Sequence, residues 1–191
     1  MNEDIFSISP LIKTDRLIMK LHTLEDVEDM FVVRSHPKVM KYLDTNPAEN
    51  TDVVRDRIVQ IIEDFKHKKA VNLTIRLQSN PTEAIGYMSL WRIDKHNNRG
   101  EIGYALKDNY WGKGYAIEAG KALLDYSFNK AELHSLMANI NPHNQSSRNL
   151  LLKLGFQKEA YHREDFFFNG EYLDSEIYGM TLSDYKAFTN H

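Results

Sequence analysis

The chain has 191 residues, of which 42% are apolar and 27% charged, which predicts a single domain over residues 1–191 with a full core. A formal net charge of −3 gives no electrostatic footprint for nucleic acid. The absence of cysteine excludes disulfides, thiolate zinc sites and a cysteine-bound acyl intermediate, and the absence of a long apolar run predicts no membrane segment and a cytoplasmic location.

The first half of the chain is expected to hold one strand, two helices and a three-stranded meander, after a loosely ordered segment over residues 1–13. Thr23 can cap the first helix, with Asp26 three residues on as in a variant capping box. Period-2 and helical apolar patterns set the other elements. The expected elements are a strand at 16–21, helices at 23–34 and 51–68, and strands at 71–78, 84–93 and 101–106.

The second half is expected to alternate helices and strands and to end in a hairpin. Gly155 is placed to end a helix, and Asn169-Gly170 is a strong signal for a tight hairpin turn. The expected elements are helices at 116–128 and 146–154, a strand at 134–140, and two strands around the hairpin. The order β-α-α-β-β-β-α-β-α-β-β predicts an α+β fold. Its mixed, mostly antiparallel sheet would have about six to seven strands, flanked by about four helices.

A glycine-flanked lysine stands where the third meander strand gives way to a helix. Gly112-Lys113-Gly114 would leave backbone N–H groups unpaired at the positive end of that helix, which is a ready anion site. A Walker loop needs Ser or Thr after the lysine, and here Gly114 follows it. A Rossmann fingerprint needs a third glycine where Ile117 stands.

The segment Trp111–Ala116 instead resembles the coenzyme A pyrophosphate loop of the GCN5-related N-acetyltransferase (GNAT) superfamily, whose pattern is Arg/Gln-x-x-Gly-x-Gly/Ala. Gly114 and Ala116 fit the pattern, and Trp111 departs at its first position. Further matches follow in the family's order over roughly residues 14–182, and they resemble the RimJ/RimL-type ribosomal-protein N-terminal acetyltransferases. These matches are Glu101-Ile102-Gly103-Tyr104, Asn144 with the serines that follow it, Lys153-Leu154-Gly155-Phe156, and the Asn-Gly hairpin with Tyr172-Leu173-Asp174.

The resemblance implies the GNAT fold and acetyl-CoA as cosubstrate. In that fold the sheet splits between the strands at 101–107 and 134–140, and the pantetheine arm pairs with the open strand as an added strand would. Apolar side chains on that strand could equally be core packing. Asn144 could contact the cofactor or simply cap its helix, and Arg148 could meet phosphates or solvent. The residues expected at the cofactor are Tyr104, Leu106, Trp111, Gly112, Lys113, Gly114, Tyr115, Ala116, Asn144 and Ser147.

The implied reaction is direct acetyl transfer from a thioester to a neutral amine. Glu101 is the candidate base acting through a water, although it could be a strand residue paired with Arg99 or Lys107. Many relatives carry a tyrosine acid at the position of Leu151, so Ser147 is the candidate acid here. Ser147 could instead be a first-turn helix residue bonded to backbone.

The branch resemblance implies a protein N-terminal α-amine, such as that of a ribosomal protein, as the acceptor. A polyamine, an aminoglycoside or another small amine remains open, as does a coenzyme A-binding module without turnover. The eight histidines show no metal-ligand spacing, so no metal is expected, and the chain could be a monomer or a homodimer. Acidic residues near the first two helices could attract a cationic amine or could serve surface solvation: Glu25, Glu28, Asp29, Asp44 and Glu49.

Overall fold

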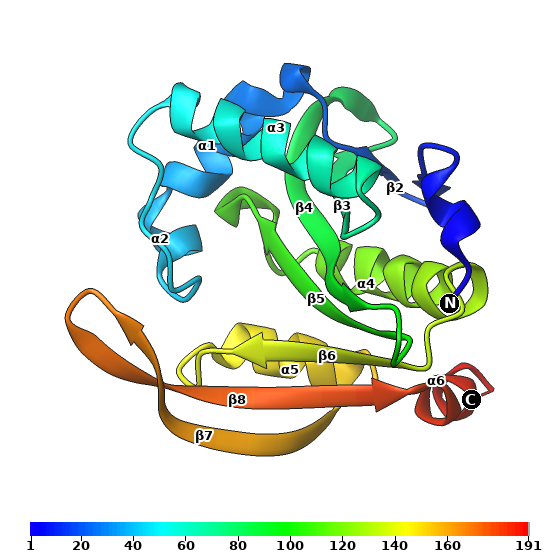
Figure 1. Cartoon of the computed structure of the whole chain (residues 1–191). Helices are drawn as coiled ribbons and strands as arrows, with labels where there is room; N and C mark the ends of the chain where they lie inside the picture. The colour runs from blue at the N-terminus through cyan, green and yellow to red at the C-terminus, as the bar shows by residue number, and fades with distance from the viewer. Residues whose placement is uncertain (191) are drawn as a thin grey trace.

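A computed structural model describes residues 1–190, and it is built around one eight-stranded sheet (Figure 1). The strand order is β1-β2-β3-β4-β5-β6-β8-β7, and the β5–β6 pair alone is parallel among these strands. The strands are β1 (Leu11–Lys13), β2 (Leu17–Leu21), β3 (Val71–Leu77), β4 (Asn80–Asp94), β5 (Arg99–Leu106), β6 (Ser135–Ile140), β7 (Gln157–Phe168) and β8 (Glu171–Thr181). The helices are α1 (Val27–Ser35), α2 (Pro37–Met40), α3 (Thr51–Lys66), α4 (Tyr115–Asp125), α5 (Gln145–Lys153) and α6 (Leu182–Thr189).

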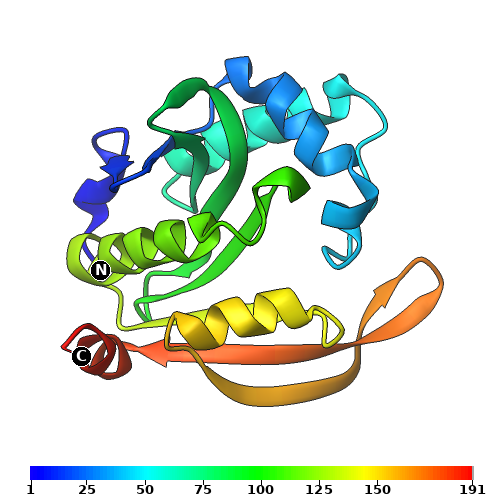
Figure 2. The ribbon, with the colours of Figure 1, turned by 180° about the vertical axis from the view of Figure 1, so that it is seen from behind.

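The helices cover the sheet in two groups, and each group closes its own apolar cluster. The smaller cluster joins α1, α2 and α3 to β4 and β5, with Val33, Ile58 and Ala105 among its members. The larger cluster packs α4, α5 and α6 against the other side of the sheet (Figures 1 and 2). No helix within residues 1–190 is both long enough and apolar enough to span a bilayer.

The sheet splits between β5 and β6. Parallel pairing joins them at three positions, and Glu101 opposite Met137 is the last of these. Beyond that point β5 stays with β4 as far as Leu106, while β6 stays with β8 as far as Ile140. The predicted split is therefore confirmed, and the outer half of β5 presents an open backbone edge.

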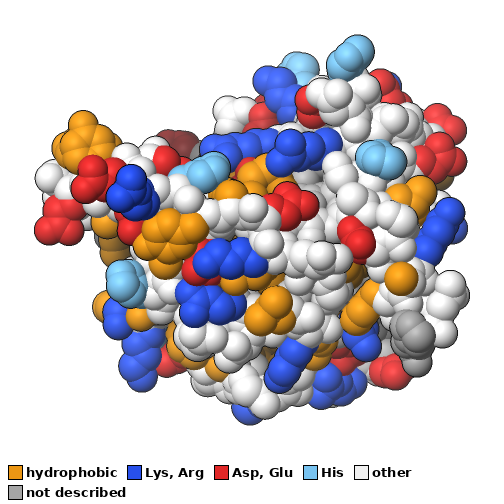
Figure 3. Space-filling view, turned by 90° about the horizontal axis from the view of Figure 1, so that it is seen from below, with side chains coloured by type: hydrophobic (Ala, Val, Ile, Leu, Met, Phe, Trp, Pro, Cys, Tyr) orange, Lys and Arg blue, Asp and Glu red, His pale blue; other side chains and the backbone are white. Residues whose placement is uncertain are grey.

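The predicted helices and strands all form, and the structure adds shorter ones. One of these is α2, which starts at Pro37 because proline suits the first turn of a helix. A capping box of Thr181 and Asp184 starts α6. At the hairpin, Asn169 and Gly170 take the positive φ angles of 49° and 87° that a tight turn requires. The hairpin projects from the body of the molecule, and in Figure 3 this projection carries hydrophobic side chains among charges of both signs.

The segment 1–13 was expected to be loosely ordered, and this expectation is wrong. A short 3₁₀ helix occupies Glu3–Phe6, and β1 pairs with β2. The terminal ammonium of Met1 donates to Asn98 Oδ1 at 2.7 Å, and Ile5 is buried in the larger cluster. These contacts are with residues far away in the sequence, so local patterning could not reveal them.

Three buried polar residues, His22, Asp26 and Arg76, lie together near the end of β2. Asp26 is fully buried and pairs with Arg76, which also donates to two backbone carbonyls. His22 lies beside them with both ring nitrogens buried and without partners among the described residues. Burial lowers the pKa of His22 from 6.5 to about 4, against the opposing field of Asp26.

This shift predicts an acid-sensitive contribution to stability. A folded pKa below the unfolded value means that the unfolded state binds more protons, so stability is complete above about pH 6.5 and falls towards pH 4. Urea unfolding should show that His22→Leu removes about 2–3 kcal/mol of the loss that the wild type suffers between pH 7 and pH 4.5. His67→Leu, at an exposed histidine, is the control. Parallel pH profiles for wild type and His22→Leu would contradict this assignment.

Candidate active site

The loop between β5 and α4 has the backbone of an anion site. Gly112 and Gly114 have φ angles of +71° and +83°, which favour glycine, and α4 begins at Tyr115. Gly114 is the N-cap and brings no side-chain acceptor, so the first N–H groups of the helix stay free of a side-chain cap. A Cβ at Gly112 would meet no atom within 4 Å. The loop therefore offers open space and backbone donors at the positive end of a helix.

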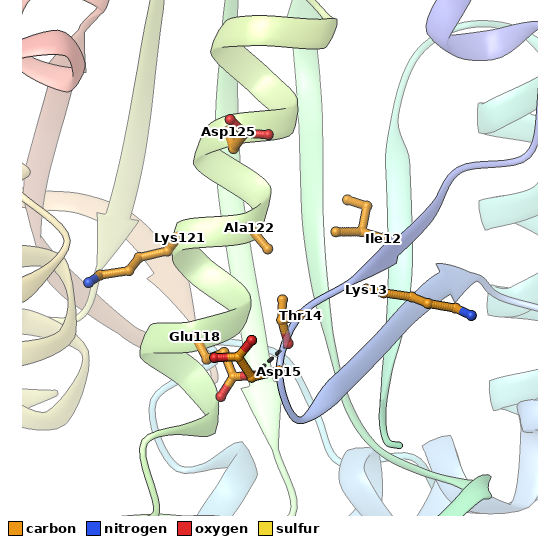
Figure 4. Close-up of a pocket in the computed structure, with 8 residues that line it drawn as sticks. All are labelled: Ile12, Lys13, Thr14, Asp15, Glu118, Lys121, Ala122 and Asp125. Atoms are coloured by element: carbon orange, nitrogen blue, oxygen red, sulfur yellow. Dashed lines mark hydrogen bonds between the residues drawn. The ribbon is translucent and has the colours of Figure 1, made fainter. Parts of the chain in front are cut away.

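Arg16, directly before β2, braces this loop, and no sequence pattern indicates that role. Its Nη1 donates to the Lys113 carbonyl at 3.0 Å, and its guanidinium lies 4.6 Å from the centre of the Tyr115 ring. Its Nε meets Glu118 Oε2 at 2.6 Å. Glu118 also accepts from Thr14, beside a shallow pocket of about 390 Å³ between the β1–β2 turn and α4 (Figure 4). Arg16 thus holds the loop from a segment about 100 residues away.

Trp111, which departs from the family pattern, ties the loop to the end of β5. Its indole Nε1 donates to the Leu106 carbonyl at 2.8 Å, while 47% of the residue stays exposed. The neighbouring Lys107 is buried and binds Asp29 at 2.8 Å and Glu83 at 2.9 Å. A buried cation between two carboxylates fixes the strand end against α1 and β4. The loop therefore starts from a rigid point.

The open edge of β5 is formed by Tyr104 and Leu106, which are two of the residues expected at the cofactor. Lys107 N–H donates to the Ile85 carbonyl, which makes that pair a hydrogen-bonded one. Hydrogen-bonded and non-bonded pairs alternate along an antiparallel ladder, so Tyr104 and Leu106 direct their backbone groups away from β4. They face the split, where β6 no longer pairs with β5.

Glu101 lies at the inner end of the split, and its partner is neither Arg99 nor Lys107, the two that the sequence suggested. Its Oε2 accepts from Arg92 Nη1 at 3.0 Å, and only 5% of the residue is exposed. A bulge in β4 gives Arg92 a φ of 46°, and its guanidinium stacks 4.3 Å from the Trp91 ring centre. Burial raises the pKa of Glu101, and Arg92 opposes this shift without cancelling it. A carboxyl group with a raised pKa is a better proton acceptor near neutral pH. Neither Arg99 nor Lys107 pairs with Glu101.

Ser147 faces a tyrosine across the split, although that tyrosine is not on its own helix. Leu151 is fully buried in the core, as a residue without an acid function would be. From β5, the Tyr104 hydroxyl lies 2.6 Å from Ser147 Oγ, and burial raises the pKa of Tyr104 to about 12. Asn144 Oδ1 accepts the Ser147 N–H at 3.1 Å, so Asn144 does cap α5.

The role of Arg148 was left open between contact with the cofactor phosphates and exposure to solvent, and the structure shows a third role. Its Nη2 and Nε each lie 3.0 Å from a carboxylate oxygen of Glu176 on β8. Glu176 is buried and also accepts from Lys158 at 2.7 Å. These bonds outweigh burial, so the pKa of Glu176 is lowered. Arg148 therefore fastens α5 to the sheet.

Together these features of the site suit the transfer of a chemical group from a carrier molecule that has an anionic end. They comprise an anion loop, an open strand edge, a buried carboxylate and a pair of hydroxyls that meet across the split. In residues 1–190, no three His, Asp or Glu side chains gather as metal ligands would.

Comparisons with known proteins agree with this arrangement. The sequence model of a family described as acetyltransferase (GNAT) domain matches residues 16–157. An uncharacterized N-acetyltransferase p20 of Bacillus licheniformis is 34% identical over 174 residues, which cover 91% of this chain and 97% of that protein. The ribosomal protein uS5 alanine N-acetyltransferase of Escherichia coli is 34% identical over 84 residues, 44% of this chain and 43% of that protein. Spermidine N(1)-acetyltransferase of Escherichia coli is 28% identical over 159 residues, 82% of each chain.

Solved structures share the fold. RimL, a ribosomal L7/L12 α-N-protein acetyltransferase in complex with coenzyme A, superposes with a TM-score of 0.81 at 20% identity, over 90% of this chain and 98% of that one. Spermidine N-acetyltransferase from Vibrio cholerae, in complex with CoA and spermine, gives 0.80 at 22% identity, over 91% and 99%.

The loop geometry predicts that Gly114→Ala weakens the binding of coenzyme A. Alanine at a φ of +83° costs about 1–2 kcal/mol, and its Cβ would lie 3.2 Å from Arg16 Nη2. Because the loop must keep its shape around an anion, calorimetry should show a Kd raised at least about tenfold. Gly170→Ala carries similar strain at a φ of +87° on the distant hairpin, and it should leave the Kd unchanged. Equal effects of the two variants would refute the loop assignment.

Proposed function

Because the chain belongs to the GNAT acetyltransferase family and is an N-acetyltransferase, we propose that it moves the acetyl group of acetyl-CoA directly to the N-terminal α-amine of a protein, such as a ribosomal protein. The similarity to the uS5 alanine acetyltransferase and the fold shared with RimL support this acceptor. The observation that carries the proposal is the split of the sheet, which sets the open edge of β5 beside the anion loop.

Acetyl-CoA would lie along this split. The N–H groups of Gly112 to Ala116 would receive the pyrophosphate, and Lys113 would add positive charge beside it. The backbone of Tyr104 and Leu106 would pair with the amides of the pantetheine arm, as an added strand pairs with a sheet edge. The Leu106 carbonyl already accepts from Trp111, so Leu106 would act mainly through its N–H.

Glu101 would prepare the amine. An α-amine has an ordinary pKa near 8 and is mostly protonated at pH 7, so it must lose a proton before it attacks. That proton would pass through a water to the Glu101 carboxylate, whose raised pKa suits a base. The amine nitrogen then bonds to the thioester carbon, the carbon–sulfur bond breaks, and the second proton of the amine goes to the coenzyme A thiolate.

Ser147 would support the leaving thiolate. Tyr104 remains protonated near neutral pH because its pKa is about 12, so its hydroxyl can donate to Ser147 Oγ. The serine O–H is then free to donate to the sulfur. A thiol has an ordinary pKa near 8.5, so the thiolate takes up a proton at the end of the reaction with modest help.

A small cationic amine is the second candidate acceptor, because the match to spermidine acetyltransferase covers 82% of both chains. A coenzyme A-binding module without turnover is the third. The release of free thiol from acetyl-CoA, measured with N-terminal peptides, polyamines and aminoglycosides, separates the three. Fastest turnover with peptides supports the proposal, and fastest turnover with a small amine contradicts its choice of acceptor. Tight binding of acetyl-CoA without turnover on any acceptor would contradict catalysis.

Glu101→Gln should reduce turnover in a pH-dependent way. The loss should be about 10²-fold at pH 6.5 and much smaller at pH 9, where the amine is already neutral. A pH series of kcat with the best acceptor measures this. Glu28→Gln, at an exposed position on α1, is the matched control. A loss that is equal at both pH values would assign Glu101 a structural role.

Ser147→Ala should lower kcat by about 10²-fold and leave the Kd of acetyl-CoA nearly unchanged. The cap of α5 survives this change, because Asn144 accepts the backbone N–H of residue 147. Tyr104→Phe should cause a smaller loss, since it removes only the donor to the serine. Single-turnover kinetics measure both variants, and a wild-type rate for Ser147→Ala would exclude this residue from the reaction.

A further inference from the structure

The loop between α2 and α3 brings the carboxylate of Asp44 into contact with the β6 side of the split. Asp44 Oδ1 accepts from Asn141 Nδ2 at 3.3 Å. Asn141 directly follows β6 and opens the turn into α5, whose first turn carries Ser147. In Figure 1 the loop after α2 reaches down towards the end of β6. Asp44 therefore stands where a ligand would enter from the side of α1–α3.

This is also the side of the sheet that Glu101 faces. Side chains alternate along β5, so Glu101 points to the same side as Ala105. Ala105 packs in the cluster beneath α1, α2 and α3. An acceptor amine that approaches Glu101 from this side would pass the loop that holds Asp44.

The backbone of Asp44 is held in a conformation that few residues adopt. Its φ is 47°, in the left-handed region, which aspartate and asparagine tolerate better than other non-glycine residues. Residues held in this way cluster at ligand sites, where the surrounding structure keeps a side chain in place. Glycine would suit this φ best, so the presence of aspartate at position 44 is consistent with a role for its carboxylate in binding a ligand.

The charge of Asp44 is poorly compensated. The side chain is half-buried, and burial raises its pKa, with the neutral amide of Asn141 as the opposing influence. No lysine or arginine within residues 1–190 forms an ion pair with it, whereas Asp29 on α1 binds Lys107. The other acidic residues considered in this region, Glu25, Glu28 and Glu49, are exposed to solvent.

We propose that Asp44 binds a second cationic group on the acceptor, so that the preferred acceptors carry another positive charge close to the amine that is acetylated. This inference rests on the proposed function and narrows its substrate class. A polyamine supplies that charge as a second ammonium group, and a protein N-terminus supplies it as a neighbouring lysine or arginine side chain. The cation would form a charge-assisted bond with Asp44, and the long bond from the neutral Asn141 would compete weakly.

The test compares acceptors that differ by one charge. 1,4-Diaminobutane is set against 1-aminobutane, and Ala-Lys-Ala-amide against Ala-Leu-Ala-amide, with thiol release from acetyl-CoA as the signal. The wild type should prefer the acceptor with the extra charge in at least one pair, and the pair with the larger preference identifies the source. Asp44→Asn should lower kcat/KM for that acceptor by about 10- to 100-fold, mainly through KM. Its uncharged partner should be affected less than about twofold.

Asparagine keeps the size of the side chain and tolerates a positive φ, so Asp44→Asn should fold, and its Tm and KM for acetyl-CoA should match the wild type. Glu49→Gln removes an exposed charge from the same loop and should change neither ratio. Asn141→Ala breaks the contact across the split but keeps the Asp44 charge, so it should retain the preference. Equal losses on charged and uncharged acceptors in both Asp44→Asn and Asn141→Ala would make the contact a structural latch and overturn the inference. Absence of turnover with every acceptor would instead count against the proposed function itself.

Discussion

Backbone pairing between β5 and β6 ends at Glu101 and Met137, and this ending opens the gap around which the candidate site is built. Strand β5 continues along β4 for five more residues, so the edge of β5 that faces β6 stays open in the middle of the sheet. An open edge is a liability in most proteins, because it invites another strand. Here it lies next to the anion loop, and an extended ligand with an anionic end can satisfy both features at once.

The two walls of the split touch through removable polar contacts. Tyr104 meets Ser147 on the side of α4 and α5, and Asp44 meets Asn141 on the side of α1–α3. The first contact ends in the first turn of α5, and the second ends in the segment that joins β6 to α5. Two ion pairs outside the split hold the surrounding elements: Arg148 links α5 to Glu176, and Arg16 links the anion loop to Glu118. A rigid frame thus surrounds a gap whose inner hydrogen bonds a ligand can replace.

The sequence predicted much of this, because several features are local. Glycines at positive φ, the Asn144 cap and the Asn169-Gly170 turn each depend on neighbouring residues. Some of the missed contacts join distant segments, and others depend on local backbone geometry that the sequence does not reveal. Arg16 and Lys113 are 97 residues apart, and Arg92 reaches Glu101 only because a bulge turns it. The sequence could not predict the role of Trp111, because its partner is the backbone carbonyl of Leu106, and a backbone carbonyl carries no sequence signal.

Amide hydrogen exchange on β5 tests the central claim most directly. The Tyr104 and Leu106 N–H groups face the split, while those of Gly103 and Ala105 face β4 and are already bonded. Residue-resolved exchange by NMR, with and without saturating coenzyme A, reports on each group separately. The open edge predicts that coenzyme A slows exchange at Tyr104 and Leu106 by at least about tenfold relative to Gly103 and Ala105. Unchanged exchange at Tyr104 and Leu106, with coenzyme A shown to be bound, would contradict the account.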